Sequence, residues 1–237
     1  MAILYITGAG VSAQSGIPTF RGEDGFWTIG SENYTPQQMA TRAMYQHNPQ
    51  EFLKWYYHRF VTYRHHGPNE VHHWLSDKQL ITQNIDGLDS KAGNTHYISI
   101  HGRINEMTLF HEQGEPVNRI IAPWDRVDET QLTKSLLDLF KIGKHGPKLN
   151  ESLKPYVLLF DEFYTELYQI NKAQKQMLQA EKIVFIGTSF SVNITQIAIE
   201  TARQYDIPIE VVDPAPCHIL HSNVTYHKMT ASEYITH

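Results

Sequence analysis

Three polar residues in the first half of the chain have side chains suited to binding or reacting with a ligand. His101 carries an imidazole, whose ordinary pKa of about 6.5 lets it take up a proton near neutral pH. Asn84 and Asp86 supply an amide and a carboxylate two residues apart, and such groups hydrogen-bond ribose hydroxyls or a carboxamide. A structural role is the alternative in each case, because Asn and Asp often cap loops and a single histidine is often only packed.

A glycine-rich turn stands near the start of the chain, directly after its first apolar run. Gly8, Ala9 and Gly10 open this turn and Ser12 follows. Glycines at the end of a strand allow backbone N–H groups to approach a pyrophosphate at the start of a helix. An ordinary dinucleotide turn is followed about 20 residues later by an acidic residue after a strand, and no strand is predicted there. A tight turn without a ligand is the alternative.

Short apolar runs rich in β-branched residues predict the strands that position these side chains. Segments of helical length lie between several of them, such as residues 162–180 and 192–205. This alternation predicts an α/β fold with a doubly wound, parallel, Rossmann-like sheet, in which ligands bind at the carboxyl ends of the strands. The predicted strands are residues 3–6, 79–82, 97–100, 156–160, 183–186 and 209–212.

Two segments interrupt the alternation. Residues 22–70 are rich in aromatic side chains with a helical pattern, and residues 102–153 are polar and irregular with one helical stretch near residues 129–140. We expect these two insertions to form a small helical second domain. The Rossmann-like domain is then built from residues 1–21, 71–101 and 154–237.

Composition excludes several classes of protein. The 237 residues carry a net charge of −5 with a pI of about 6.3, so no overall charge attracts nucleic acid or an anionic membrane. Cys217 is the single cysteine, which excludes an intramolecular disulfide and indicates a reducing compartment. No apolar run approaches the roughly 18 residues of a membrane span. We expect a cytoplasmic protein.

Five segments in order resemble the sirtuin family, the NAD-dependent protein-lysine deacylases. Each lies at or just after a predicted strand, and the likeness covers roughly residues 3–101 and 154–236. The segments are GAGVSAQSGIPTFRG (residues 8–22), TQNIDGLDSKAG (82–93), IHG (100–102), LKPYVLLFDE (153–162) and GTSFSV (187–192).

The resemblance implies the cofactor NAD and a role for each residue of these segments. In the family the acyl-lysine oxygen displaces nicotinamide from ribose, and a histidine, here His101, then deprotonates a ribose hydroxyl that attacks the acyl carbon. Asn84 would contact the nicotinamide ribose, as a second catalytic residue, and Asp86 would contact nicotinamide. The remaining NAD contacts implied are Gly8, Ala9, Gly10, Ser12, Phe20, Arg21, Gln83, Gly187, Thr188, Ser189 and Asp213.

The aromatic segment resembles the sirtuin helix that lines the acyl pocket. Tyr56 and Arg59 share one face of a helix at a spacing of three residues, and this pair resembles sirtuins that remove succinyl or malonyl groups. Tyr57 competes for the tyrosine position, and a packed tyrosine with an arginine at the rim is the alternative. The peptide would lie between residues 157–162 and 189–192, which adds Val157, Phe160 and Phe190 as substrate contacts.

The family pattern fails at the zinc site, because no cysteine stands between residues 102 and 154. The histidines and glutamates there lack the paired spacing of a structural zinc site, so we predict no zinc. Packing is expected to replace the metal, through Trp124, Leu136, Leu137 and Phe140. The residue after Phe160 is Asp161 where the family often has glycine, which places the geometry of the substrate loop in question.

Two other functions remain open from the sequence. The missing zinc and altered loop favour an enzyme that transfers ADP-ribose to protein or hydrolyses NAD. A non-catalytic module that binds NAD or ADP-ribose is the further alternative, and His101 argues against it because a pure binding protein needs no base.

Overall fold

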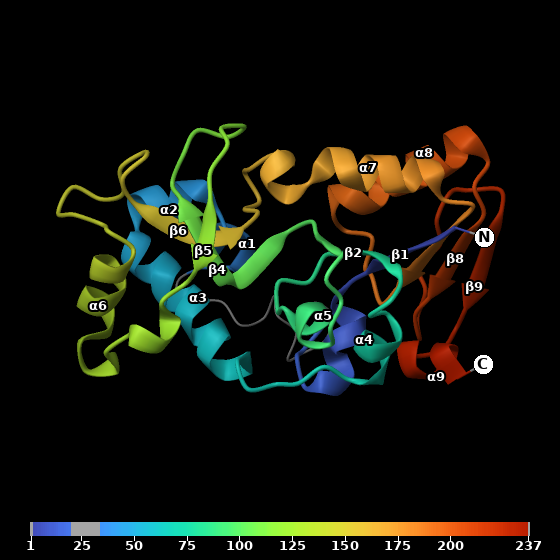
Figure 1. Cartoon of the computed structure of the whole chain (residues 1–237), viewed down its shortest axis with the longest axis horizontal. Coiled ribbons are helices and arrows are strands. Elements are labelled where there is room, and N and C mark those ends of the chain that lie inside the picture. Colours follow the sequence, from blue (N-terminus) through green and yellow to red (C-terminus); the bar gives the residue numbers. More distant parts are fainter. Residues whose placement is uncertain (1, 20–33, 237) are drawn as a thin grey trace.

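A parallel sheet of six strands forms the larger part of the molecule (Figure 1). The structure is a computed structural model that describes residues 2–19 and 34–236. The strand order is β3-β2-β1-β7-β8-β9, with every neighbouring pair parallel. The bounds are β1 Ile3–Thr7, β2 Gln79–Thr82, β3 Ile98–Ser99, β7 Lys182–Ile186, β8 Ile209–Val212 and β9 Val224–His227.

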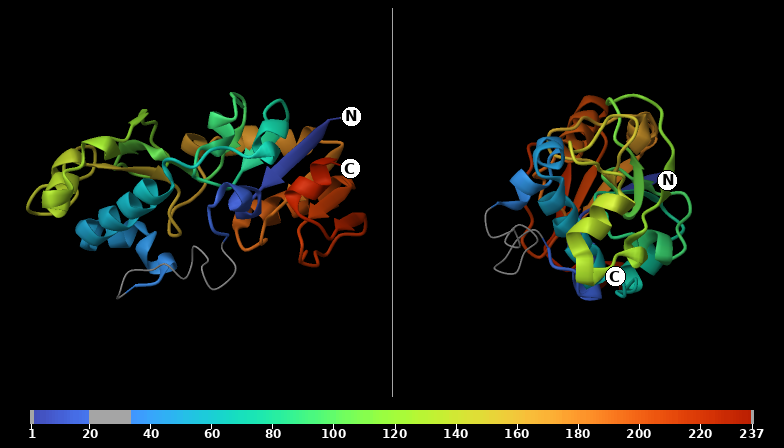
Figure 2. Two further views of the ribbon diagram at one scale, coloured as in Figure 1. Left: turned by 90° about the horizontal axis from the view of Figure 1, so that it is seen from below. Right: turned by 90° about the vertical axis from the view of Figure 1, so that its left-hand side faces the viewer.

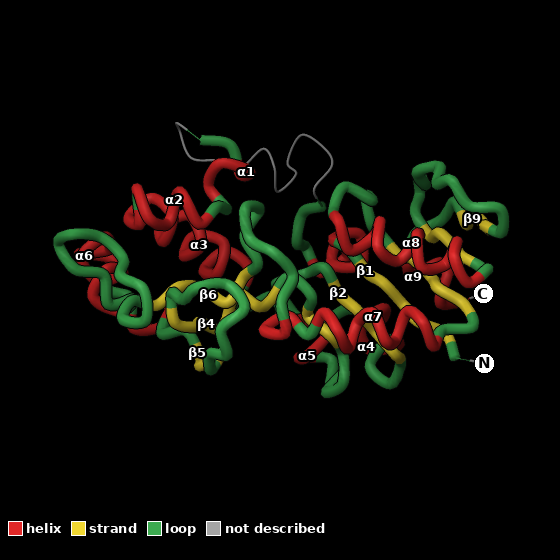
Figure 3. The backbone as a smooth tube through the Cα atoms, turned by 90° about the horizontal axis from the view of Figure 1, so that it is seen from above, coloured by secondary structure: helices red, strands yellow, loops and turns green. Residues whose placement is uncertain are grey.

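Helices cover both faces of this sheet, as Figure 3 shows. On one face α7 (Ile170–Gln179) and α8 (Asn193–Tyr205) bury their apolar sides against β1, β2, β3, β7 and β8. On the other face α4 (Glu70–Trp74) and α9 (Ala231–Thr236) pack on the same strands. The prediction of a doubly wound parallel sheet is therefore confirmed. Five of its strands lie where the sequence predicted them, and β9 was not predicted.

A second sheet of three antiparallel strands lies beside the first, in the order β5-β4-β6. Its strands are β4 (Gly102–Leu109), β5 (Arg119–Ile121) and β6 (Leu153–Val157). The prediction of a parallel strand at residues 156–160 was wrong. The strand there is β6, which ends at Val157 and pairs antiparallel with β4 instead of joining the parallel sheet. A short apolar run shows that a strand is buried, but it does not show which strand is its partner.

The small sheet packs with four helices at one end of the molecule (Figure 2). They are α1 (Pro36–Met39), α2 (Arg42–His47), α3 (Pro49–Tyr63) and α6 (Leu132–Leu139). The 3-10 turns η2 (Trp124–Arg126) and η3 (Glu129–Gln131) belong to the same end of the molecule. The other short elements are α5 (Leu88–Lys91), η1 (Ala9–Ser15) and η4 (Glu166–Tyr168). The division of the chain at residues 22–70 and 102–153 stays a prediction, and β6 crosses its boundary at residue 154.

The core of this smaller unit is built around Trp124. Its indole is 1% exposed, donates its N–H to the Ile104 carbonyl, and packs on Phe140 and Phe60 at 4.9 and 5.8 Å between ring centroids. Leu136 and Phe140 are fully buried beside it, and Leu137 is partly buried against the same cluster. The residues expected to pack in place of a metal therefore do form one core.

Replacing the central indole tests this packing. Trp124→Ala leaves a cavity in the cluster and an unpaired Ile104 carbonyl, so we expect a loss of about 3–5 kcal/mol in the free energy of unfolding. Urea unfolding followed by circular dichroism measures it. Ile121→Ala, on β5 with 73% of its surface exposed, is the matched control and changes stability little. Equal losses in both variants would show that the indole does not organise this core.

Candidate active site

A single large cavity of about 1010 Å³ opens at the carboxyl ends of the parallel strands. Its walls come from both sheets and from α3. Phe20 and Arg21 lie outside the described residues. Phe190 does not line the cavity, because its ring packs on Phe185 beneath the sheet. The predicted site residues that line it are Gly8, Ala9, Gly10, Ser12, Tyr56, Arg59, Gln83, Asn84, Asp86, His101, Val157, Phe160, Gly187, Thr188, Ser189 and Asp213.

The cavity lies where the strand order reverses, since β1 has β2 on one side and β7 on the other. The turns after β1 and β7 touch there: the Gly10 N–H donates to the Gly187 carbonyl at 2.9 Å. A Cβ on Gly10 would stand 2.5 Å from the Gly187 Cα, and Gly187 has a positive φ of 62°. These glycines are therefore needed to let the two turns meet, besides any approach to a ligand.

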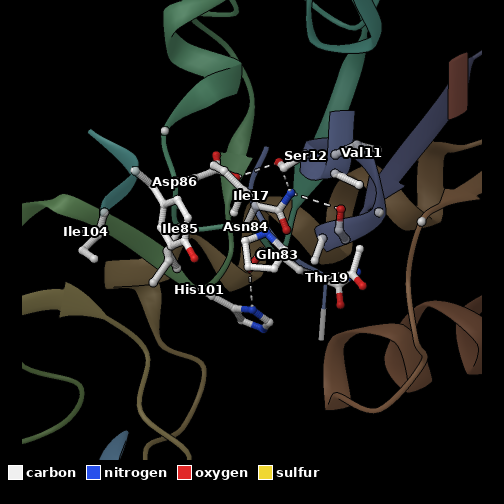
Figure 4. A pocket seen from close by; sticks show the side chains of 18 of the residues that line it. Val11, Ser12, Ile17, Thr19, Gln83, Asn84, Ile85, Asp86, His101 and Ile104 are labelled. Carbon is white, nitrogen blue, oxygen red and sulfur yellow. Dashed lines mark hydrogen bonds between the residues drawn. The ribbon is translucent and has the colours of Figure 1, made fainter. Parts of the chain in front are cut away.

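Three polar side chains form a hydrogen-bonded group under the first turn, as Figure 4 shows. The Ser12 hydroxyl donates to Asp86 at 2.7 Å and accepts from the Asn84 amide at 3.1 Å. The same amide donates to the Gly8 carbonyl. Gln83 reaches the other way and donates to Thr188 at 3.1 Å. The network fixes the amides and the carboxylate at the cavity wall before a ligand arrives.

His101 stands at the end of β3, opposite this group. Its Nδ1 lies 2.9 Å from the Gln83 carbonyl, which can only accept, so Nδ1 carries the proton and Nε2 is the basic nitrogen. Nε2 lies 2.9 Å from the Tyr164 hydroxyl. Burial lowers the pKa of His101 to about 4, against a smaller opposing effect of the Gln83 carbonyl. The imidazole is therefore neutral at neutral pH and able to take a proton.

The following residue, Gly102, explains why the histidine sits so close to β6. Its φ is 84°, and a Cβ there would stand 2.0 Å from the Tyr156 carbonyl oxygen. Only glycine lets the two backbones pair at this point. The His-Gly pair thus delivers the imidazole to the boundary between the two sheets.

The far end of the cavity is lined by α3. Tyr56 and Arg59 both line it, and Arg59 is 6% exposed with its guanidinium 3.2 Å from the ring centre of Trp55. Burial lowers the pKa of Arg59 to about 9. Tyr57 faces away, because its hydroxyl donates to Glu129 at 2.8 Å. The structure thus separates the two tyrosines and places Arg59 inside the cavity, not at its rim.

Asp161 fastens the loop that leaves β6. Its carboxylate accepts from the backbone N–H groups of Arg42 and Ala43, at 2.6 and 3.1 Å, in the first turn of α2. The Phe160 N–H also donates to the Ala40 carbonyl. The aspartate in place of glycine therefore attaches this loop to the helices around the far end of the cavity.

Comparisons with known proteins agree on one family. The family model "Sir2 family" matches residues 8–194. The chain is 32% identical to NAD-dependent protein deacylase 1 of Caldanaerobacter subterraneus over 80% of this chain and 72% of that protein. It is 30% identical to the NAD-dependent protein deacylase of Leptospira interrogans over 90% of this chain and 81% of that protein.

The chain belongs to the Sir2 family. A solved Sir2 homologue in complex with NAD superposes with a TM-score of 0.73 at 25% identity, covering 99% of this chain and 86% of that one. A Sir2 homologue mutant in complex with ADP-ribose gives a TM-score of 0.74 at the same identity, with 88% of that chain covered. The sirtuin resemblance of the five sequence segments is thereby confirmed.

Sequence reasoning missed three residues around this sirtuin site. Tyr164 lies just past the fourth matched segment, and its contact with His101 depends on the path of the loop. His72 is fully buried with Nε2 3.4 Å from the Ser12 hydroxyl, and only the fold brings α4 there. Asp89 is 2% exposed behind Asp86. Its position inside the matched segment TQNIDGLDSKAG was the one available signal.

The described part of the chain contains neither a metal-binding cluster nor a membrane-spanning helix. In residues 2–19 and 34–236 no group of three His, Cys, Asp or Glu side chains is placed to hold a metal ion. No helix in these ranges has the length and apolar character needed to cross a bilayer. The absence of zinc from this Sir2 protein stays a prediction.

The buried carboxyl of Asp89 gives the site a pH-dependent stability. Burial and the nearby Asp86 raise the pKa of Asp89 to about 7, against a smaller effect of Thr82. The folded state then holds this proton more tightly than the unfolded state, so its contribution is complete below about pH 4 and is lost as the pH rises to about 7. From pH 5 to pH 8 the loss is roughly 2–3 kcal/mol.

Asp89→Asn removes this titrating group. The free energy of unfolding of the variant should therefore increase relative to that of the wild type as the pH rises. Urea unfolding at pH 5, 6, 7 and 8 measures the difference. Asp138→Asn, a change of an exposed carboxylate on α6, is the control and should show no such trend. A difference between Asp89→Asn and wild type that stays constant with pH would contradict the raised pKa.

Proposed function

We propose that this Sir2 protein consumes NAD to remove acyl groups from protein lysine, giving nicotinamide and O-acyl-ADP-ribose. The observation that carries the proposal is the neutral imidazole of His101 at the wall of a cavity that Ser12, Asn84 and Asp86 also line. NAD fits the hydrogen-bonding groups of this wall: its hydroxyls and amides can donate and accept, and its carboxylate accepts, which suits sugar hydroxyls and a carboxamide. When bound, it supplies the glycosidic bond that is broken.

The chain's own residues bind and orient this co-substrate. The two glycine turns and Thr188 form the wall suited to the phosphates, and Asp213, beyond β8, lines the part suited to the adenosine hydroxyls. Asn84 and Asp86 are held by Ser12 for the nicotinamide end. His101 takes up the proton of a ribose hydroxyl after nicotinamide has left. The resemblance alone adds Phe20 and Arg21 to the proposed NAD contacts.

We infer that the preferred acyl group carries a carboxylate, as in succinyl or malonyl lysine. Support comes from Arg59, a buried guanidinium at the far end of the cavity, and from Tyr56 on the same face of α3. A guanidinium fork binds a carboxylate through two parallel hydrogen bonds, so this side chain suits an acyl group that ends in a carboxylate. The peptide itself is proposed to lie along Val157 and Phe160.

Hydrolysis of NAD without a peptide is the second candidate function. Phe160 lines the cavity and is 52% exposed, so water reaches this part of the proposed substrate site. Protein ADP-ribosylation and simple binding of NAD are further outcomes of the same assay. The single cysteine supports a reducing compartment, and we propose the cytoplasm.

The purified protein with NAD and acetyl, malonyl or succinyl peptides tests the function by mass spectrometry. We expect free lysine and O-acyl-ADP-ribose in equal amounts. His101→Ala should lower deacylation by at least 100-fold, because it removes the base, while NAD binding measured by calorimetry persists. Nicotinamide and ADP-ribose without change in the peptide would show a hydrolase. Intact, bound NAD would show a binding module.

Arg59→Met tests the acyl preference with the same peptides. Loss of the guanidinium should lower kcat/KM for the succinyl peptide at least tenfold more than for the acetyl peptide. Arg203→Met, on the exposed side of α8, is the matched control and should leave the ratio unchanged. Equal losses for both peptides in Arg59→Met would reject recognition of a carboxylate.

A further inference from the structure

The base of this site already has a hydrogen-bond partner. His101 Nε2 lies 2.9 Å from the Tyr164 hydroxyl, and the two rings are nearly parallel, at 19° with centroids 6.0 Å apart. Since Nδ1–H is held by the Gln83 carbonyl, Nε2 has one lone pair, and the phenol O–H donates to it. A sugar hydroxyl therefore has no free lone pair on this imidazole to donate to while Tyr164 stays in place.

Tyr164 lies in a segment that is fastened on both sides. Upstream, Asp161 caps α2 through two backbone N–H groups. Downstream, Tyr168 stacks on Tyr156 with centroids 5.3 Å apart, and the Tyr156 hydroxyl donates to the Leu167 carbonyl. These contacts hold the phenol beside the imidazole and oppose its movement away from the cavity wall.

The phenol oxygen is accessible to a ligand and remains protonated. Tyr164 lines the same cavity as His101. Burial raises the pKa of Tyr164 to about 12, against a smaller effect of the Ile194 backbone N–H. At neutral pH the group therefore donates its proton to Nε2. One oxygen lone pair accepts from the Ile194 backbone N–H, and the other remains to accept from another hydroxyl.

We propose that Tyr164 relays the proton from the ribose hydroxyl to His101, a role that rests on the proposed function. The ribose O–H donates to the Tyr164 oxygen, whose own proton passes to Nε2. His101 becomes an imidazolium, Tyr164 is regenerated as a neutral phenol, and the freed electron pair of the ribose oxygen forms the bond to the acyl carbon. As this bond forms, the π pair of the bond between the acyl carbon and the lysine nitrogen moves to that nitrogen. Tyr164 is thus a further catalytic residue, which stands between the ribose hydroxyl and the basic nitrogen of His101.

Tyr164→Phe removes the hydroxyl and keeps the ring. In ligand-free protein, NMR titration should show the pKa of His101 rising from about 4, because the donated hydrogen bond favours the neutral imidazole. Deacylation kcat should nevertheless fall about 10–100-fold. Exchange of labelled nicotinamide into NAD with acyl peptide present should stay within about twofold of wild type, because cleavage of the glycosidic bond precedes the proton transfer.

Tyr168→Phe is the matched control, since that hydroxyl is buried without a hydrogen-bond partner among the described residues. It should leave all three readouts unchanged. Deacylation that is unchanged or faster in Tyr164→Phe would overturn the relay, because the strengthened imidazole would then act directly. If nicotinamide exchange and deacylation fall equally, the substitution has damaged the site as a whole and the relay is rejected. If the pKa of His101 does not change, Tyr164 does not donate a hydrogen bond to it and the relay is again rejected. A wild type without exchange or deacylation instead overturns the proposed function.

Discussion

The hydrogen bond between His101 Nδ1 and the Gln83 carbonyl determines what the site can do. It comes from neighbouring strands, because Gln83 follows β2 and His101 follows β3. A carbonyl cannot donate, so the bond decides which ring nitrogen is basic and turns that nitrogen toward the cavity. Burial keeps the ring neutral, and a neutral ring is the form that accepts a proton. A protonated His101 ring would instead place a positive charge at the wall of the cavity.

The smaller unit shows how a sirtuin fold is maintained with no cysteine in residues 102–153. Packing around Trp124 joins η2, α3, α6 and β4 into one cluster. The antiparallel sheet adds the backbone pairing of β6 with β4. A large buried aromatic group contributes through many contacts that tolerate some rearrangement, whereas a metal site depends on four ligands at fixed distances.

The sequence predicted the parts of the fold that depend on local pattern. Five of the six parallel strands carry apolar runs and are followed by residues assigned to the NAD site, so most of the sheet and the glycine turns could be predicted. β9 has no such run and was missed. The partner of β6 could not, because pairing is decided by residues distant in the chain. The same limit applies to Tyr164 and His72, whose neighbours come from β3 and η1. Phe190 was assigned by proximity to the motif, and its side chain turns to Phe185 instead.

The hydrogen bonds from α2 to Asp161 affect how the two parts of a substrate bind. The peptide is proposed to lie along the loop after β6, and α2 packs on α3, which lines the end of the cavity proposed for the acyl group. A rigid fastening makes these two regions move as one body. If both subsites are used as proposed, binding of the modified side chain and docking of the flanking peptide are expected to be thermodynamically linked, so that the kind of acyl group changes the affinity for the surrounding peptide.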